Sequence, residues 1–128
     1  MALADLIQTD IIRLVKGPLA LKPIEFLGDS LARLREFPEG ARGDAGFELF
    51  AVQRGEDPSD WKPMKAIVPG VREIRIRDPA GAFRVVYVAT MPDAVYVPHA
   101  FRKKTRRTAK RDLDLAASRY RQLRKRTS

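Results

Sequence analysis

The stretch VREIRIRDPAGAFRVVYVA, residues 71–89, decides the fold of this chain. Apolar and polar residues alternate over 71–78, and residues 82–89 are rich in β-branched and aromatic side chains, as in strands of a sheet. Between these two runs, Pro79-Ala80-Gly81 supplies turn residues, and a short Gly-containing connection is typical of a β-hairpin. The stretch therefore predicts two adjacent antiparallel strands.

The residues after this hairpin continue the same pattern. Residues 94–101, AVYVPHAF, have strand character. Because proline cannot donate a ladder hydrogen bond, Pro98 predicts that this strand is either at an edge or bulged. A helix is expected over residues 108–125, with one face formed by Leu113, Ala116, Ala117, Tyr120 and Leu123. The second half of the chain thus predicts a three-strand meander and a C-terminal helix.

The residues before the hairpin predict a short strand and two helices. The apolar run 24–27 is the expected first strand, and Gly28-Asp29-Ser30 then offers N-cap candidates for a helix. A second helix follows Pro38 and stops near Arg54, and residues 57–64 are rich in turn residues and are expected to form a loop. We therefore predict an α+β domain: a small antiparallel sheet with a helical hairpin on one face, plus the C-terminal helix.

Residues 3–16 form a separate helical pattern that ends at Gly17-Pro18. We expect residues 1–21 to be a helical extension and residues 22–128 to be the main domain. An amphipathic helix of this kind either packs on the core of its own domain or contacts a partner, which includes a second copy of the chain. Both alternatives are open from the sequence.

The basic residues are concentrated in the last quarter of the chain. The formal net charge is +9, and residues 99–128 contain 12 Lys or Arg but only 2 acidic residues. The preceding 98 residues are close to neutral, with 13 basic and 14 acidic residues. A basic excess of this size points to a polyanionic or acidic partner, such as nucleic acid, an anionic membrane surface or an acidic protein.

Several function classes lack their characteristic residues. The chain has no cysteine and a single histidine, His99, so neither thiolate catalysis nor an ordinary transition-metal site is expected. The acidic residues show no spacing typical of a magnesium site, and there is no Gly-rich phosphate loop. No apolar run is long enough to span a membrane, and no secretory signal is expected, so we expect a cytoplasmic protein without a cofactor.

Charged residues occur within the expected strands. Alternation groups Glu73, Arg75 and Arg77 on one face of residues 71–78. Arg84 and Tyr87 lie on opposite faces of the next strand, so we expect the one on the core face to be partly buried. An arginine among valines usually has a carboxylate or phosphate partner, and Glu73 is the structural candidate for Arg84. A purely structural ion pair and an anion site both fit this pattern.

Residues 99–112, HAFRKKTRRTAKRD, form the strongest local signal. Seven Lys or Arg residues follow the last expected strand and precede the last helix. Cations at a helix N-terminus oppose the preference of the helix dipole, so their position favours a bound polyanion, although a solvated basic segment is the alternative. His99 has an ordinary pKa near neutrality, which makes it a candidate for proton transfer, although a lone histidine is more often structural.

Taken together, WKPM, PGVREIRIRD, AFRVVYVA and AVYVPHAFRKKTRRTAKRDLDLA resemble the RelE/ParE superfamily of bacterial toxins. The likeness covers about residues 22–125 and is closest to the phage-derived, HigB-like branch. It implies an endoribonuclease that cuts messenger RNA on the ribosome without a metal. It also implies a helix-turn-helix antitoxin as partner, in a toxin–antitoxin complex.

The resemblance also implies roles for individual residues. By motif, Arg75 and Arg84 take the basic positions of two neighbouring strands, and Lys103 and Lys104 take the basic position after the last strand. Glu73 stands where other members have lysine, which makes it a candidate general base. We expect the 2′-hydroxyl to attack the adjacent phosphate, with cations stabilising the transition state. The expected RNA-binding residues are Arg77, Phe101, Arg102, Arg106, Arg107, Lys110 and Arg111. For Phe101, stacking on a splayed base and packing in the core are both open.

Two other functions remain open from the sequence. A ParE-like toxin of the same fold would inhibit DNA gyrase without cutting RNA, and such an inhibitor needs no cluster of cations on the sheet. A non-catalytic RNA-binding module would also need the cations. In that case Arg84→Ala would weaken RNA binding, and neither the wild type nor the variant would cleave RNA.

Overall fold

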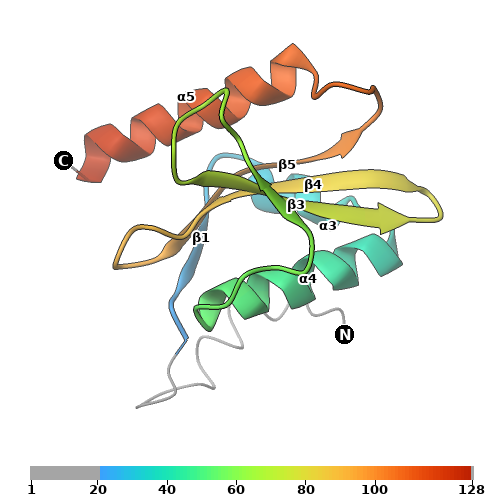
Figure 1. Cartoon of the computed structure of the whole chain (residues 1–128), viewed down its shortest axis with the longest axis horizontal. Helices are drawn as coiled ribbons and strands as arrows, with labels where there is room; N and C mark the ends of the chain where they lie inside the picture. The colour runs from blue at the N-terminus through green and yellow to red at the C-terminus, as the bar shows by residue number, and fades with distance from the viewer. Residues whose placement is uncertain (1–20, 128) are drawn as a thin grey trace.

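A computed structural model describes residues 21–127 of the protein (Figure 1). The helix expected over residues 3–16, and the oligomer contact assigned to it, lie outside the described residues. The strands are β1 (Ile24–Phe26), β2 (Trp61–Pro63), β3 (Val71–Asp78), β4 (Gly81–Val88) and β5 (Val95–Lys103). The helices are α3 (Ser30–Arg35), α4 (Glu39–Gln53) and α5 (Lys110–Thr127). These elements confirm the expected α+β class.

The strands form one sheet in the order β1-β5-β4-β3-β2. The β3–β4 hairpin is confirmed: its register runs from Val71 opposite Val88 to Asp78 opposite Gly81. At the turn, the Asp78 carboxylate accepts a hydrogen bond from the backbone N–H of Ala80, and Gly81 has φ of 145°, a conformation that favours glycine.

Two edge strands differ from the expectation. β1 pairs with β5 in parallel, so the sheet is mixed rather than antiparallel. β2 lies within the expected loop 57–64 and pairs antiparallel with β3, with Trp61 opposite Ile74. Both strands have three residues, and segments this short carry too little periodicity to be recognised without their pairing partners.

β5 is a bulged strand in the interior of the sheet, between β1 and β4. Its register with β4 shifts between the pairs at Val86 and Val88, close to Pro98, and β1 covers its other side. Of the two alternatives that Pro98 left open, the bulge is therefore correct.

Helices cover both faces of the sheet. α3 and α4 lie on one face and α5 lies on the other. Figure 1 shows α4 below the strands and α5 above them. The core on the α4 side includes Leu34, Ile74 and Val85, and the core on the α5 side includes Val86 and Leu123. The amphipathic stripe expected on α5 is what covers the second face.

The sequence predicted burial for whichever of Arg84 and Tyr87 lies on the core face of β4, and in the structure both are buried. Arg84 is 6% exposed and Tyr87 is 1% exposed, although they lie on opposite faces of β4. Tyr87 belongs to the core on the α4 side, whereas Arg84 lies on the face that carries α5.

Among residues 21–127, no helix is long and apolar enough to cross a membrane.

Candidate active site

The candidate site lies on the α5 face of the sheet, where β3, β4 and β5 present side chains in cross-strand rows. One row holds Arg75, Arg84 and Phe101, and the next holds Glu73, Val86 and His99. Neighbouring strands lie about 4.8 Å apart, so side chains in one row are direct neighbours. The pairing register thus places two arginines and one carboxylate together, as the sequence predicted for Glu73, Arg75 and Arg84.

Arg84 lies at the centre of this arrangement. Its Nε atom is 3.9 Å from Oε1 of Glu73, and its side chain is 7% exposed while that of Glu73 is 14% exposed. One guanidinium nitrogen donates a 3.0 Å hydrogen bond to the backbone carbonyl of Phe83. Burial lowers the pKa of Arg84 from its ordinary value, and the charge of Glu73 opposes that shift.

This part of the sheet contains polar atoms whose hydrogen-bonding capacity is unused. Nε of Arg84, Oε2 of Glu73 and Nδ1 of His99 are buried and lack a hydrogen-bond partner in the structure. Buried polar groups in proteins are nearly always paired, and exceptions often mark functional positions. Three such atoms on one face of the sheet are the clearest structural sign of a site.

Arg75 is the more accessible arginine of the pair. Its side chain is 21% exposed and its Nε lies 3.9 Å from Oδ1 of Asp60, which precedes β2. Its backbone N–H also donates a 2.8 Å hydrogen bond to the carbonyl oxygen of Asp60. Asp60 therefore positions Arg75 from outside the strand. Arg77 is exposed and, with Arg75 and Asp60, lines a cavity of about 140 Å³.

His99 is buried in an Asp–His pair. Its Nε2 lies 2.8 Å from Oδ1 of Asp112, a residue of the first turn of α5. With the carboxylate oxygen as acceptor, Nε2 is assigned as the donor of this hydrogen bond. His99 is 3% exposed, and burial lowers its pKa, while the hydrogen bond with Asp112 opposes this. Phe101 stacks on the imidazole at 5.2 Å between ring centroids, and Phe101 itself is opposite Arg84.

The basic stretch does not gather at one point. Lys103 pairs with Ala82 across the sheet and lies in line with Phe101, on the α5 face. Arg102 lies on the other face, with its guanidinium 5.8 Å from the centre of the Phe83 ring. The remaining members are exposed and lie in or next to the loop between β5 and α5: Lys104, Arg106, Arg107, Lys110 and Arg111.

Of these exposed cations, Lys110 forms a 2.8 Å ion pair with Asp114. Lys103 alone of the basic stretch is thus placed by the sheet register beside the arginine row. Figure 1 shows the β3–β4 turn and the loop after β5 at the same end of the molecule.

Two residues of the site were missed by sequence reasoning. Asp60 lies in a turn-rich segment, and only its backbone contact with β3 brings it to Arg75. Asp112 had a weak signal, because it is the single acid in the first turn of a helix that begins with two cations. An acid that interrupts a basic run at a helix start is favoured by the helix dipole and is a reasonable candidate for a partner.

A comparison with family models shows the family of this chain. The family model described as "Phage derived protein Gp49-like (DUF891)" matches residues 32–121, which is more than half of the chain. The chain belongs to the Gp49-like family. This is a toxin-like family of toxin–antitoxin systems, so an antitoxin is the implied partner. No curated protein sequence matches the chain.

The matched range contains the whole site of this Gp49-like protein. It spans β3, β4, β5 and the first part of α5, which together carry the arginine row, Glu73 and the His99–Asp112 pair. β1 and the last residues of α5 lie outside it. Among residues 21–127, no group of three or more His, Asp or Glu side chains is placed to hold a metal ion.

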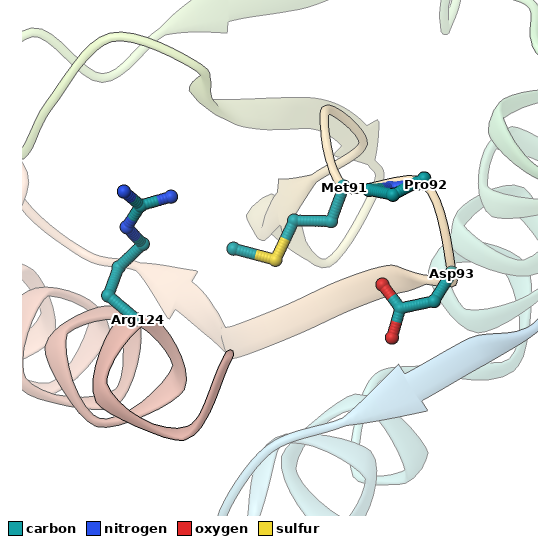
Figure 2. Close-up of a pocket in the computed structure, with 4 residues that line it drawn as sticks. All are labelled: Met91, Pro92, Asp93 and Arg124. Atoms are coloured by element: carbon teal, nitrogen blue, oxygen red, sulfur yellow. The ribbon is translucent and has the colours of Figure 1, made fainter. Parts of the chain in front are cut away.

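A larger cavity of the Gp49-like chain lies elsewhere. It has a volume of about 410 Å³ and is lined by Met91, Pro92, Asp93 and Arg124. Figure 2 shows the Met91 side chain directed from the β4–β5 loop toward the Arg124 side of this space. Arg124 lies 12 residues beyond Asp112 on the same helix, about 18 Å along its axis. This cavity is therefore separate from the candidate site.

Proposed function

We propose that this protein is the toxin of a type II toxin–antitoxin system and acts as an endoribonuclease on messenger RNA. The observation that carries the proposal is the cross-strand row of Arg75 and Arg84 beside Glu73, with Lys103 on the same face. Fixed cations beside a carboxylate are the groups that RNA transesterification needs. Membership of the Gp49-like toxin-like family supports the proposal independently.

The proposed reaction is attack of a ribose 2′-hydroxyl on the adjacent phosphorus. The bond from the 2′-oxygen to phosphorus forms, and the bond from phosphorus to the 5′-oxygen of the next nucleotide breaks. Glu73 accepts the proton of the 2′-hydroxyl, because it is the carboxylate that the strand register places beside the two arginines. Lys103 or Lys104 returns a proton to the leaving 5′-oxygen. The products are a 2′,3′-cyclic phosphate and a free 5′-hydroxyl.

The two arginines differ in side-chain exposure, and this difference suggests different roles. Arg75 is partly exposed and contacts the phosphate, whereas Arg84 is buried behind it and contributes positive potential in a region of low dielectric. Glu73 lies 3.9 Å from Arg84, and this contact orients the carboxylate. The cations of the chain itself supply the charge stabilisation, so the proposed reaction needs no metal ion.

The exposed cations around the site are proposed to hold RNA by its backbone. Arg77, Lys104, Arg106, Arg107 and Arg111 are exposed at the end of the molecule that carries the arginine row. Contacts to phosphate are independent of sequence and weaken steeply with salt. This set fits messenger RNA in the ribosomal decoding site. We also propose that the protein is a cytoplasmic toxin of the RelE/ParE superfamily, in its HigB-like branch, and that a helix-turn-helix antitoxin neutralises it.

The test is mapping of 5′ ends in messenger RNA after brief induction of the protein. We expect discrete new ends within translated frames for the wild type. Arg75→Ala and Arg84→Ala should lower cleavage about 100-fold or more, the usual cost of removing a group that stabilises a charged transition state. Arg54→Ala is the matched control, because Arg54 is an exposed arginine that follows α4, the helix on the opposite face of the sheet.

The other outcomes point to the two rival functions. Growth arrest without new RNA ends would reject cleavage and favour inhibition of DNA gyrase. RNA binding that Arg84→Ala weakens, with no cleavage by the wild type, would favour a non-catalytic binding module.

A further inference from the structure

A second cavity lies at the free edge of the sheet, away from the arginine row. It has a volume of about 410 Å³, and its lining includes Trp61, Pro63, Lys65, Val68 and Arg72. β2, which supplies two of these residues, is the last strand of the sheet, so no further strand covers this edge among residues 21–127. The volume is sufficient for a planar ring the size of a nucleobase.

Trp61 and Arg72 form the built part of this cavity. The Arg72 guanidinium carbon lies 4.0 Å from the centre of the Trp61 ring. Pairing of β2 with β3 fixes both side chains, and Asp57 holds the same guanidinium by a 3.1 Å ion pair. Trp61 is nevertheless partly exposed. An indole held in place and stacked on an arginine is a rigid surface on which a second planar ring can stack.

The charges around the cavity favour an anionic ligand. Lys65 and Arg72 line it, and no Asp or Glu is among the lining residues. Single-stranded RNA is bound by this combination, in which aromatic and guanidinium planes stack on bases while nearby cations contact the phosphates.

We propose that the Trp61–Arg72 cavity is a base-stacking subsite for single-stranded RNA. The inference rests on the proposed function, because it extends the substrate contacts of the same nuclease. Arg72 and Arg75 are three residues apart on β3, about 10 Å, and they face opposite sides of the sheet. One RNA strand therefore reaches both by passing around the β2 edge, with one base in the cavity and a phosphate at Arg75.

The test uses intrinsic fluorescence, because Trp61 is the only tryptophan in the chain. Short single-stranded RNA is titrated into the protein, with inorganic polyphosphate and poly-L-glutamate as polyanions that lack bases. We expect RNA to quench Trp61 emission and the two controls to leave it nearly unchanged. Trp61→Ala should weaken RNA binding about 5- to 100-fold, the usual effect of losing one stacked base.

A relocated tryptophan separates local stacking from general quenching. The double variant Trp61→Phe, Phe47→Trp places the indole on α4, where Phe47 is 58% exposed, and RNA should not quench it. Trp61→Phe alone keeps an aromatic ring in the cavity and should bind RNA more tightly than Trp61→Ala, which excludes misfolding as the cause of the loss.

Failure of this inference is distinguishable from failure of the proposed function. Arg84→Ala should lose cleavage and keep the quenching of Trp61 by RNA. Absence of quenching, or equal quenching by polyphosphate, would overturn the subsite even where cleavage is observed. Equal quenching by poly-L-glutamate would also overturn it and would assign the cavity to an acidic protein segment such as an antitoxin peptide. Quenching by RNA without any cleavage would support the subsite and reject the nuclease.

Discussion

The buried pair of His99 and Asp112 can be tested by a double-mutant cycle. The two side chains join β5 to the first turn of α5 at 2.8 Å, and both are nearly inaccessible to solvent. Phe101 stacks on His99 and lies opposite Arg84, so the pair also supports the centre of the candidate site. The variants are His99→Leu, Asp112→Leu and the combination of both.

The expected free energies of unfolding follow from what each variant leaves behind. His99→Leu leaves a buried carboxylate without its partner and should cost about 3 kcal/mol. Asp112→Leu leaves a neutral imidazole with an unpaired N–H and should cost about 1–2 kcal/mol. The double variant replaces both polar groups by apolar ones and should cost only about 1 kcal/mol, because apolar replacement of a buried pair is often nearly neutral.

The assay is urea unfolding followed by far-UV circular dichroism at pH 7.5. The sum of the two single costs should exceed the cost of the double variant by about 3–4 kcal/mol, with m-values unchanged. Asp114→Leu is the matched control: it lies on the same helix, its partner Lys110 is exposed, and the change should stay within about 0.5 kcal/mol. Additive losses, with a double variant about 4–5 kcal/mol less stable, would refute the coupling.

Two further predictions concern stability. Burial holds the pKa of His99 below its ordinary value, so the unfolded chain binds more protons than the folded protein below about pH 6.5. The free energy of unfolding should therefore fall by up to about 1.4 kcal/mol per pH unit as the pH falls. His99→Gln should flatten this pH dependence in urea midpoints measured from pH 7.5 to 5, and an unchanged slope would contradict the assignment. Arg119 donates hydrogen bonds to the Pro98 carbonyl at 3.0 Å and to Asp29 at 2.7 Å. Arg119→Ala should therefore lower the free energy of unfolding by about 1–3 kcal/mol. Lys110→Ala removes a cation from an exposed ion pair and should change that free energy by less than about 0.5 kcal/mol, and equal effects of the two variants in the same urea assay would show that the Arg119 contacts are not stabilising.

The local pattern of the sequence determined the hairpin, the helices and the α+β class. Residues 71–89 specify β3 and β4 because their side-chain pattern and turn residues act between near neighbours in the chain. The stripe on α5 likewise follows from helical spacing within one segment. The same alternation correctly grouped Glu73 with Arg75, because two residues on one strand share a face whatever the strand packs against.

Only the tertiary structure decided what those faces meet. Arg84 is buried on the face of the sheet that carries α5. Lys103 joins that face while the neighbouring Arg102 does not, which depends on the bulge in β5. Asp60 and Asp112 reach the site from separate segments, and Trp61 becomes part of a strand only by pairing with β3. Contacts of this kind depend on register and packing between distant residues, and no periodicity within a single segment encodes them.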